Sequence, residues 1–296
     1  MHLTLDMKKL FIVGLGFMFT FRALAQQEST ILSGEIGIMA GASQYFGDLN
    51  PDMHFNTPKP AVGIFFRKQF GNYIAARVQA LYTQLGYSDV YNTQNEFEHR
   101  RNLSFNTNIW ELMLLGDFNF FKFIPGDGGH RYTPYITFGL GIFSYDPYAY
   151  YQGSKVYLRP LGTEGQGSAA FPDRKPYSTM AFCIPLGIGF KYNINPHLNW
   201  GFEITYRFTT TDYIDDVSTT YAGINNFPTL PNGSPSLSGV LQDRSSETGV
   251  TPIGTEGKQR GYSNQNDGYL TATLTLSFNL TSYKCPSPYT DNLRSR

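Results

Sequence analysis

The 296-residue chain is poor in charged residues and in cysteine. Only 16% of its residues are charged, against about 25% in an average soluble protein, whereas 16% are aromatic. The two cysteines, Cys183 and Cys285, are too few for a scaffold built on disulfides, although one bond between them stays open for an exported protein. The sequence also lacks a phosphate-binding loop, a zinc-ligand spacing and a nucleophile elbow.

A basic excess is missing as well. The chain has 23 basic and 23 acidic residues, and removal of the N-terminal segment described below makes it slightly acidic. Nucleic-acid-binding domains typically carry a basic patch or stripe. We therefore expect no nucleic-acid partner.

Long hydrophobic runs are absent once the N-terminus is set aside. Two lysines precede the apolar stretch LFIVGLGFMFTF, and Ala23-Leu24-Ala25 follows it, which is the pattern of a signal peptide with its cleavage site. We expect residues 1–25 to be a signal peptide, translated from Met1 or from Met7, and residues 26–32 to be a short N-terminal segment. Further along, no apolar run approaches the roughly 20 residues of a spanning helix. Any crossing of a membrane must therefore use strands.

Apolar and small polar residues alternate in the stretch YLTATLTLSFNL at 269–280. Such alternation is typical of a strand with one apolar and one polar face. Each candidate strand after the second has one clean apolar face. The seven strands predicted before this one lie at 34–46, 61–70, 74–83, 110–120, 134–145, 183–192 and 199–208.

The connections between these strands alternate in length. The short ones are 71–72, 122–131 and 193–197, and the long ones are 47–60, 88–104, 146–180 and 209–267. Outer-membrane barrels have short periplasmic turns and longer outer loops, whereas a secreted β-sandwich, the alternative, has no reason to alternate. We predict an all-β fold over 33–280, an eight-stranded antiparallel transmembrane β-barrel of the OmpX/OmpA type in the outer membrane. Its extracellular loops should be long, and the two longest, 146–180 and 209–267, should carry little regular structure. Both termini should be periplasmic, and 281–296 should form a periplasmic tail.

The polar strand faces should line the barrel lumen. An eight-stranded barrel has an interior that side chains can fill, and buried charges need partners. A gated conductance is the alternative, but it has no support beyond the same residues. We therefore expect a polar network in the lumen, formed by Arg77, Glu111, Asp117, Lys191, Glu203 and Arg207.

Signals for chemistry are weak. His99 lies beside two glutamates in NEFEHRRN, which can orient an imidazole, but the segment is also an exposed charge run without a nucleophile. The signal at His54 is weaker still. The clustered carboxylates of Asp212, Asp215 and Asp216 suit calcium, yet their spacing matches no loop motif and favours a solvated or turn-forming acidic rim. We predict no catalytic residue, no cofactor and no metal site.

Three phrases carry a family resemblance. In order along the chain, YFGDLNP at 45–51, NINPHLNWGFEITYRF at 193–208 and TDYIDDVSTTY at 211–221 resemble PorG-type proteins, the porin-like outer-membrane barrels of Bacteroidetes associated with the type IX secretion system. The resemblance runs from about Ser33 to about Cys285. It implies a non-enzymatic integral component that contacts a periplasmic ring, built by a lipoprotein and its partner, and that supports protein secretion and, in gliding members, motility.

The strand order and the resemblance together point to a periplasmic face. Two alternatives to the secretion function stay open. One is a standalone outer-membrane barrel of adhesin or membrane-stabilising type that acts through its outer loops, and the other is a lipid-modifying barrel enzyme. Outer-membrane lipid is the other expected partner. The residues expected at the periplasmic partner face are Gly126, Asp127, His130, Asn195, Pro196, His197, Lys284 and Cys285.

Overall fold

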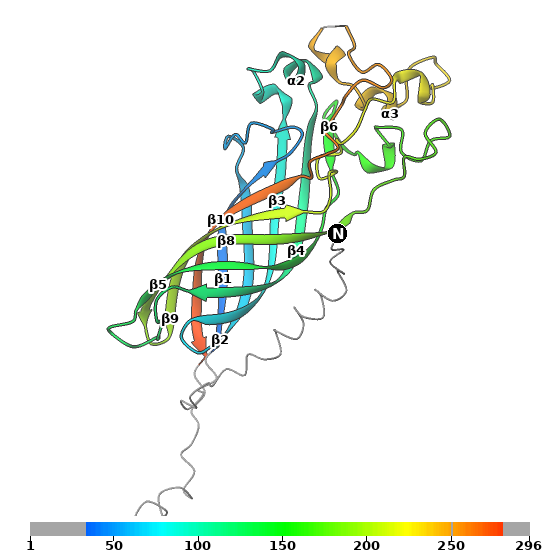
Figure 1. Cartoon of the computed structure of the whole chain (residues 1–296). Coiled ribbons are helices and arrows are strands. Elements are labelled where there is room, and N and C mark those ends of the chain that lie inside the picture. Colours follow the sequence, from blue (N-terminus) through cyan, green and yellow to red (C-terminus); the bar gives the residue numbers. More distant parts are fainter. Residues whose placement is uncertain (1–33, 250, 281–296) are drawn as a thin grey trace, which may run out of the picture. The chain divides into compact units, whose positions relative to one another are not determined.

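The computed structural model describes residues 34–249 and 251–280. The predicted signal peptide, the segment 26–32 and the tail 281–296, with Lys284 and Cys285, lie outside the described residues. Eight long strands dominate the described part (Figure 1). They are β1 Gly34–Phe46, β2 Lys59–Phe70, β3 Ile74–Ser88, β4 Ser104–Asn119, β5 Tyr132–Ser144, β8 Met180–Asn195, β9 Leu198–Thr209 and β10 Gly268–Leu280.

These strands form one antiparallel sheet that closes on itself. Their order around the barrel is β3-β2-β1-β10-β9-β8-β5-β4, and the pairing of β3 with β4 completes the circle. That closing pair runs from Ile74 opposite Phe118 to Ser88 opposite Ser104. Closure gives every one of the eight strands a partner on both edges, which removes the exposed edges that invite aggregation. The predicted eight-stranded antiparallel barrel is confirmed.

The outer wall of the barrel is apolar. On three strands that lie apart in sequence, the outward side chains of Ile38, Leu114 and Leu274 are 60%, 62% and 61% exposed. A continuous exposed apolar surface of this kind is the lipid-facing surface of a membrane barrel. We call it the apolar band. It is bordered by aromatic residues at both ends, which include Phe70, Phe118, Phe120, Tyr132 and Trp200 at one end and Tyr82, Trp110, Tyr206 and Phe208 at the other.

The two ends of the barrel differ as predicted. At the turn end, the connections 71–73, 120–131 and 196–197 are short. At the loop end, four longer connections join the strands: 47–58, 89–103, 145–179 and 210–267. No helix in the described part of the chain is long and apolar enough to cross a membrane.

The two longest loops carry little regular structure, as expected, since their helices and strands are three to five residues long. All four long loops nevertheless pack on one another. Together they form a folded cap, which we define as residues 47–58, 89–103, 145–179, 210–249 and 251–267. The composition of these loops, rich in Gly, Ser and Pro, predicts irregular chain. Contacts between loops that are distant in sequence fold this irregular chain into the cap. The elements of the cap are η1 Asp89–Tyr91, α2 Glu96–Arg101, β6 Tyr148–Tyr151, β7 Ser154–Tyr157, η2 Arg159–Leu161, η3 Ile224–Asn226, α3 Leu237–Leu241 and η4 Ser245–Thr248.

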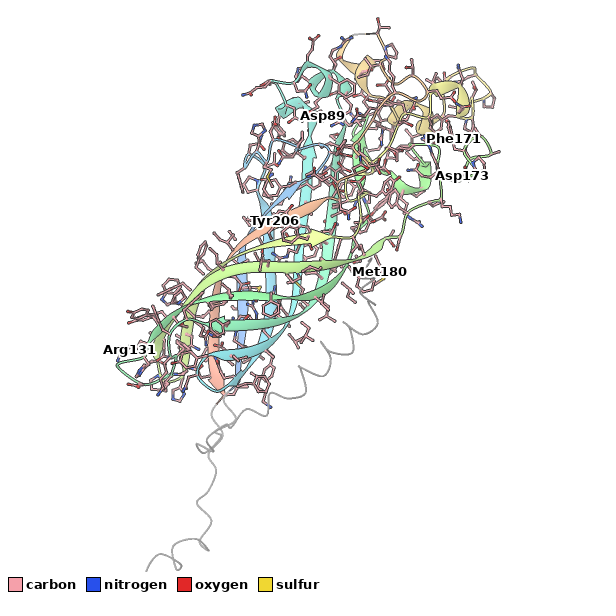
Figure 2. The ribbon with its side chains drawn as sticks, viewed as in Figure 1. Asp89, Arg131, Phe171, Asp173, Met180 and Tyr206 are labelled. Atoms are coloured by element: carbon pink, nitrogen blue, oxygen red, sulfur yellow. The ribbon has the colours of Figure 1, made fainter. Side chains whose placement is uncertain are left out.

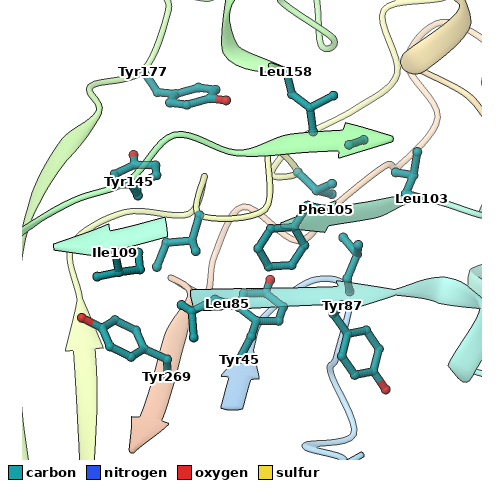
Figure 3. Close-up of a cluster of buried hydrophobic side chains, with 14 of the residues drawn as sticks. Tyr45, Leu85, Tyr87, Leu103, Phe105, Ile109, Tyr145, Leu158, Tyr177 and Tyr269 are labelled. Carbon is teal, nitrogen blue, oxygen red and sulfur yellow. The ribbon is translucent and has the colours of Figure 1, made fainter. Parts of the chain in front are cut away.

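A buried cluster joins the cap to the barrel. Strand ends contribute Tyr45, Leu85 and Phe105, and loops contribute Leu158 and Ile214; all five are at most 5% exposed. Figure 3 shows their neighbours converging at the loop end of the strands. Burial of large apolar side chains stabilises a structure by about 1.5–3 kcal/mol each. The cap is therefore packed on the barrel through one buried core, which extends into the loop end of the lumen.

Candidate functional site

The lumen near the turn end holds a network of ion pairs. Arg67 on β2 pairs with Glu35 on β1, and its Nε lies 2.5 Å from Oδ2 of Asp117 on β4. Arg77 on β3 reaches Asp117 at 3.5 Å and Glu203 on β9 at 2.7 Å. All five side chains are at most 4% exposed. The network thus ties five strands together through charges that are paired, as buried charges must be.

Neutral side chains complete this network. The Tyr135 hydroxyl on β5 donates to Glu203 at 2.6 Å. Glu35 accepts from Ser277 on β10 at 2.7 Å and from Asn199 at 2.8 Å. The bonds from Ser277 and Asn199 satisfy Oε2 of Glu35, the oxygen that Arg67 leaves free. The Tyr135 hydroxyl instead shares Oε2 of Glu203 with Arg77. Both arrangements lower the cost of burying the ions.

Lys191 differs from the other predicted lumen residues. It is 3% exposed, but its ammonium group makes no hydrogen bond with a described residue. Instead it lies 5.0 Å from the ring centre of Phe123 and 5.2 Å from that of Tyr135. It therefore contacts aromatic rings at the turn end, where a cation–π attraction replaces direct ion pairing.

A separate ion pair crosses the lumen closer to its loop end. Nη2 of Arg207 on β9 lies 2.8 Å from Oε1 of Glu111 on β4, and the Tyr269 hydroxyl on β10 donates to the same carboxylate at 2.6 Å. Strands β4 and β9 are separated by β5 and β8, and β10 stands opposite β4 in the closed order. Side chains therefore meet across the lumen, and the interior is a packed polar core of the kind that an eight-stranded barrel permits.

The structure brings all six predicted lumen residues into the interior and adds two that sequence reasoning missed, Glu35 and Arg67. Glu35 stands in a Gly-rich strand with loose alternation. Arg67 follows Phe65 and Phe66 and precedes Lys68, so its strand face could not be read from alternation alone. The need of buried charges for partners gave no signal either, because the three predicted acids already balanced the three predicted bases.

The cap contains a second set of buried ions. Arg101 binds Asp89 with two hydrogen bonds of 2.8 Å and donates to the backbone oxygens of Asp48 at 2.9 Å and Arg260 at 2.6 Å. Asp89 lies within the cap (Figure 2). Because these groups come from three loops, Arg101 holds the loops to one another. The prediction of an exposed charge run at 96–101 is wrong at this residue, which is 3% exposed.

Arg260 links the remaining loop. Its guanidinium lies 3.1 Å from Glu164 and 3.7 Å from Asp216. Glu164 also accepts from the backbone of Ser218 at 2.9 Å and from the Thr219 hydroxyl at 2.7 Å. Burial raises the pKa of Asp216 to about 6. All four loops of the cap are thus joined through two buried arginines.

The acidic residues at 212–216 form no solvated rim. Asp212, Asp215 and Asp216 are 9%, 2% and 0% exposed, so that part of the prediction is wrong, although Asp216 does occupy a turn with φ of 67°. The carboxylate oxygens of Asp212 have no hydrogen-bond partner among the described residues. Burial raises the pKa of this carboxyl to about 9.

At the loop end of the lumen, which we call the mouth of the barrel, the hydroxyl of Tyr45 contacts two carboxyls. The Tyr45 hydroxyl lies 2.6 Å from Oδ2 of Asp215 and 2.8 Å from Oδ1 of Asp267. A hydroxyl carries one hydrogen, so the second contact requires a proton on a carboxyl. In agreement, burial raises the pKa of Asp267 to about 8 and that of Asp215 well above its usual range. We therefore expect one of these two carboxyls to carry a proton at neutral pH.

The candidate histidines lie apart from these networks. His99 is exposed on α2, and His54 is half-buried in the 47–58 loop. In the described residues no group of three or more His, Cys, Asp or Glu side chains is arranged to hold a metal ion. Cys183 is buried in the cluster that joins the cap to the barrel. Cys285, its candidate disulfide partner, lies outside the described residues.

The turn end brings six predicted partner-face residues together. The backbone N–H of Gly126 donates to the side chain of Asn193 at 2.9 Å, which ties the β4–β5 turn to β8. Nδ1 of His130 lies 2.7 Å from Asp127, and both side chains are partly exposed. In the β8–β9 turn, the Asn195 side chain accepts from the backbone N–H of His197 at 2.9 Å.

The two turns are neighbours. A side chain added at Gly126 would lie 3.5 Å from Pro196, and Arg131 marks the same end of the barrel in Figure 2. The predicted face thus exists as one surface at the turn end, formed by Gly126, Asp127, His130, Asn195, Pro196 and His197.

The chain is similar to several solved structures. The chain is similar to the attachment invasion locus protein Ail of Yersinia pestis, solved with the heparin analogue sucrose octasulfate, at 8% identity over 85% of this chain and 100% of that chain, with a TM-score of 0.39. It is similar to Neisserial surface protein A at 10% identity over 83% and 96%, with a TM-score of 0.39. It is also similar to the outer membrane protein OprG from Pseudomonas aeruginosa at 10% identity over 85% and 98%, with a TM-score of 0.35.

No curated protein matches the chain. A family model matches residues 8–233, a range that includes β1 to β9 and the first part of the longest loop. The match spans more than half of the sequence. The chain therefore belongs to the family described as Domain of unknown function (DUF6089).

Proposed function

We propose that this outer-membrane-type barrel is a non-enzymatic component of a protein secretion machinery of type IX, of the PorG kind, and that it anchors a periplasmic ring at the membrane. In this proposal the turn end and both termini face the periplasm and the cap faces the outside. The ring lipoprotein and its partner bind the turn-end surface. In gliding cells the same attachment would serve motility.

The observation that carries the proposal is the combination of a filled lumen with a compact turn-end surface. Ion pairs such as Arg207–Glu111 cross the interior, which leaves a structural role better supported than transport. At the turn end, two adjacent turns present exposed groups, among them His197 and the His130–Asp127 pair. The sequence phrases at 45–51, 193–208 and 211–221 supply the link to secretion.

A pull-down tests the proposal. The tagged full chain is extracted from outer membranes in mild detergent, and co-purifying proteins are quantified against an unrelated barrel. Recovery of the ring lipoprotein with its partner is the expected result. The double variant His130→Glu/His197→Glu should reduce that recovery several-fold, because both side chains lie at the turn-end surface.

The matched control is Lys258→Gln, which alters an exposed side chain of the cap and should leave recovery unchanged. Recovery of the barrel alone would refute ring attachment and would favour a standalone barrel that acts through its cap. Equal ring recovery with the turn-end variant would refute the assigned face.

A further inference from the structure

The β6–β7 hairpin of the cap has two unlike faces. Ala149 belongs to the buried cluster that joins the cap to the barrel, and Tyr151 and Val156 pack against that cluster. Alternate residues point the other way: Tyr150 is 55% exposed and Tyr157 is 44% exposed. Because successive side chains of a strand point to opposite faces, one face of the hairpin is buried against the cluster and the other exposes tyrosine side chains.

Pairing with β4 places the exposed face. Tyr148 lies opposite Asn106, and directly opposite residues of neighbouring strands share one side of the sheet. On β4 the even-numbered residues point outward, and the apolar band ends at Trp110, which is 65% exposed. The exposed face of the hairpin therefore continues the outer wall of the barrel just beyond the apolar band, where Figure 1 shows β6 beside the upper part of β4.

Aromatic rings follow each other along this surface. The rings of Tyr82 and Trp110 are 4.7 Å apart at the edge of the band. On the hairpin, the ring of Tyr148 lies 6.0 Å from that of Tyr157. The ammonium of Lys155 stands 3.8 Å from the ring centre of Tyr148 and 4.7 Å from that of Tyr157. The surface thus joins flat rings, hydroxyl groups and an exposed cation.

The charges around Lys155 favour an anion. The carboxyl of Asp146 lies within electrostatic reach of both Arg159 and Lys155, so that two cations stand against one acid in this part of the cap. Lys155 itself is exposed. A positive surface with stacking rings suits a ligand that carries both a phosphate and a sugar, because an ammonium binds phosphate as a point charge and aromatic rings stack on flat apolar faces.

We propose that the exposed face of the β6–β7 hairpin binds the phosphorylated sugar headgroup of an outer-leaflet glycolipid. The rings of Tyr148, Tyr150 and Tyr157 contact the sugar, and Lys155 contacts the phosphate. Headgroups occupy the zone directly beyond the apolar band of a membrane barrel, which is where the hairpin stands. The inference rests on the orientation in the proposed function, with the cap outside, but not on the ring partner.

Binding of purified lipopolysaccharide to the full chain in detergent tests the site. The triple variant Tyr150→Ser/Lys155→Gln/Tyr157→Ser should bind roughly tenfold more weakly than the parent, since it loses two ring contacts and a charge. Lys155→Gln alone should weaken binding roughly two- to fivefold, and this difference should vanish with dephosphorylated lipopolysaccharide. Lys258→Gln, which removes an exposed charge elsewhere in the cap, should bind like the parent.

Unchanged affinity of the triple variant, with the parent's thermal unfolding, would overturn the proposal. Equal affinity for phosphatidylglycerol vesicles would overturn the sugar contact, because that lipid supplies the phosphate alone. The ring pull-down is run on the parent and on the same variant, and normal ring recovery by both with weakened lipid binding by the variant is expected. Absence of the ring from the parent's pull-down, with normal lipid binding by the parent, would refute the secretion role and leave the lipid site standing.

Discussion

The lumen and the cap both bury charged side chains, but their charges balance differently. The lumen holds four bases and four acids, namely Arg67, Arg77, Lys191 and Arg207 against Glu35, Glu111, Asp117 and Glu203. The cap holds two buried bases and six buried acids, namely Arg101 and Arg260 against Asp89, Glu164, Asp212, Asp215, Asp216 and Asp267. A balanced set can ionise completely and pair, whereas an acidic excess must hold protons to stay buried.

The difference gives the two regions different roles. In the lumen, pairs such as Arg207–Glu111 connect strands that are not neighbours in the sheet, which makes them part of the barrel's own stability. In the cap, Arg101 and Arg260 join loops that the barrel does not need for closure. Loss of a lumen pair should therefore destabilise the whole barrel, and loss of a cap pair should loosen the cap alone.

The largest effect is expected from Arg207→Met. The change leaves the buried carboxylate of Glu111 without its cation, and breaking a buried pair in this way costs about 3–5 kcal/mol. Urea unfolding of the protein refolded in detergent, followed by the mobility of unheated samples on denaturing gels, measures the loss. The double variant Arg207→Met/Glu111→Met is the control and should recover most of the stability, since it leaves no unpaired charge. If the single variant were as stable as the parent, the Arg207–Glu111 pair would not contribute to the stability of the barrel.

Most of the barrel could be predicted from the sequence, because strand alternation depends on residues two positions apart. The outward side chains of Leu274 and Leu114 and the inward ones of Glu111 and Arg207 follow from that period alone. The method failed at Arg67, where Phe65 and Phe66 are both apolar although they point to opposite faces.

The cap could not be predicted in this way. Arg101 donates to the backbone oxygen of Arg260, 159 residues further along the chain, and no local period links such positions. The turn-end face was predicted because it depends only on strand order. Its use as a partner surface rests on the resemblance and awaits the pull-down.

A smaller and local effect is expected from Arg101→Met. The variant breaks the buried ion pair with Asp89 and the bonds to Asp48 and Arg260. Breaking a buried pair costs about 3–5 kcal/mol, but here the cost falls on the cap, so global unfolding in urea should change less than with Arg207→Met. Hydrogen exchange should show lower protection of amides in the 89–103 loop and unchanged protection in β9. Arg100→Met, which alters the neighbouring and 42% exposed side chain, is the matched control. Equal loss of protection in barrel and cap would contradict the separation of the two regions.

The smallest effect is a pH dependence confined to the cap. Burial raises the pKa of Asp48 to about 6, of Asp267 to about 8 and of Asp212 to about 9. Folding therefore favours the protonated acids, and the stability that they contribute is present below about pH 4, the usual pKa of aspartate. It is lost as the pH rises through the range from about 6 to about 9.

Amide protection factors, corrected for the intrinsic pH dependence of exchange, measure this effect between pH 5 and pH 9. Protection of the cap segment 210–218 should fall as the pH rises, because Asp215 and Asp267 then become two anions around the single hydroxyl of Tyr45. Asp267→Asn should flatten the response, since an amide does not ionise and can donate a hydrogen bond. Protection in the strands should not follow the same curve. A parallel fall in β4 and β9 would mean that the acidic excess of the cap acts on the barrel as a whole, and that the two regions form one cooperative unit.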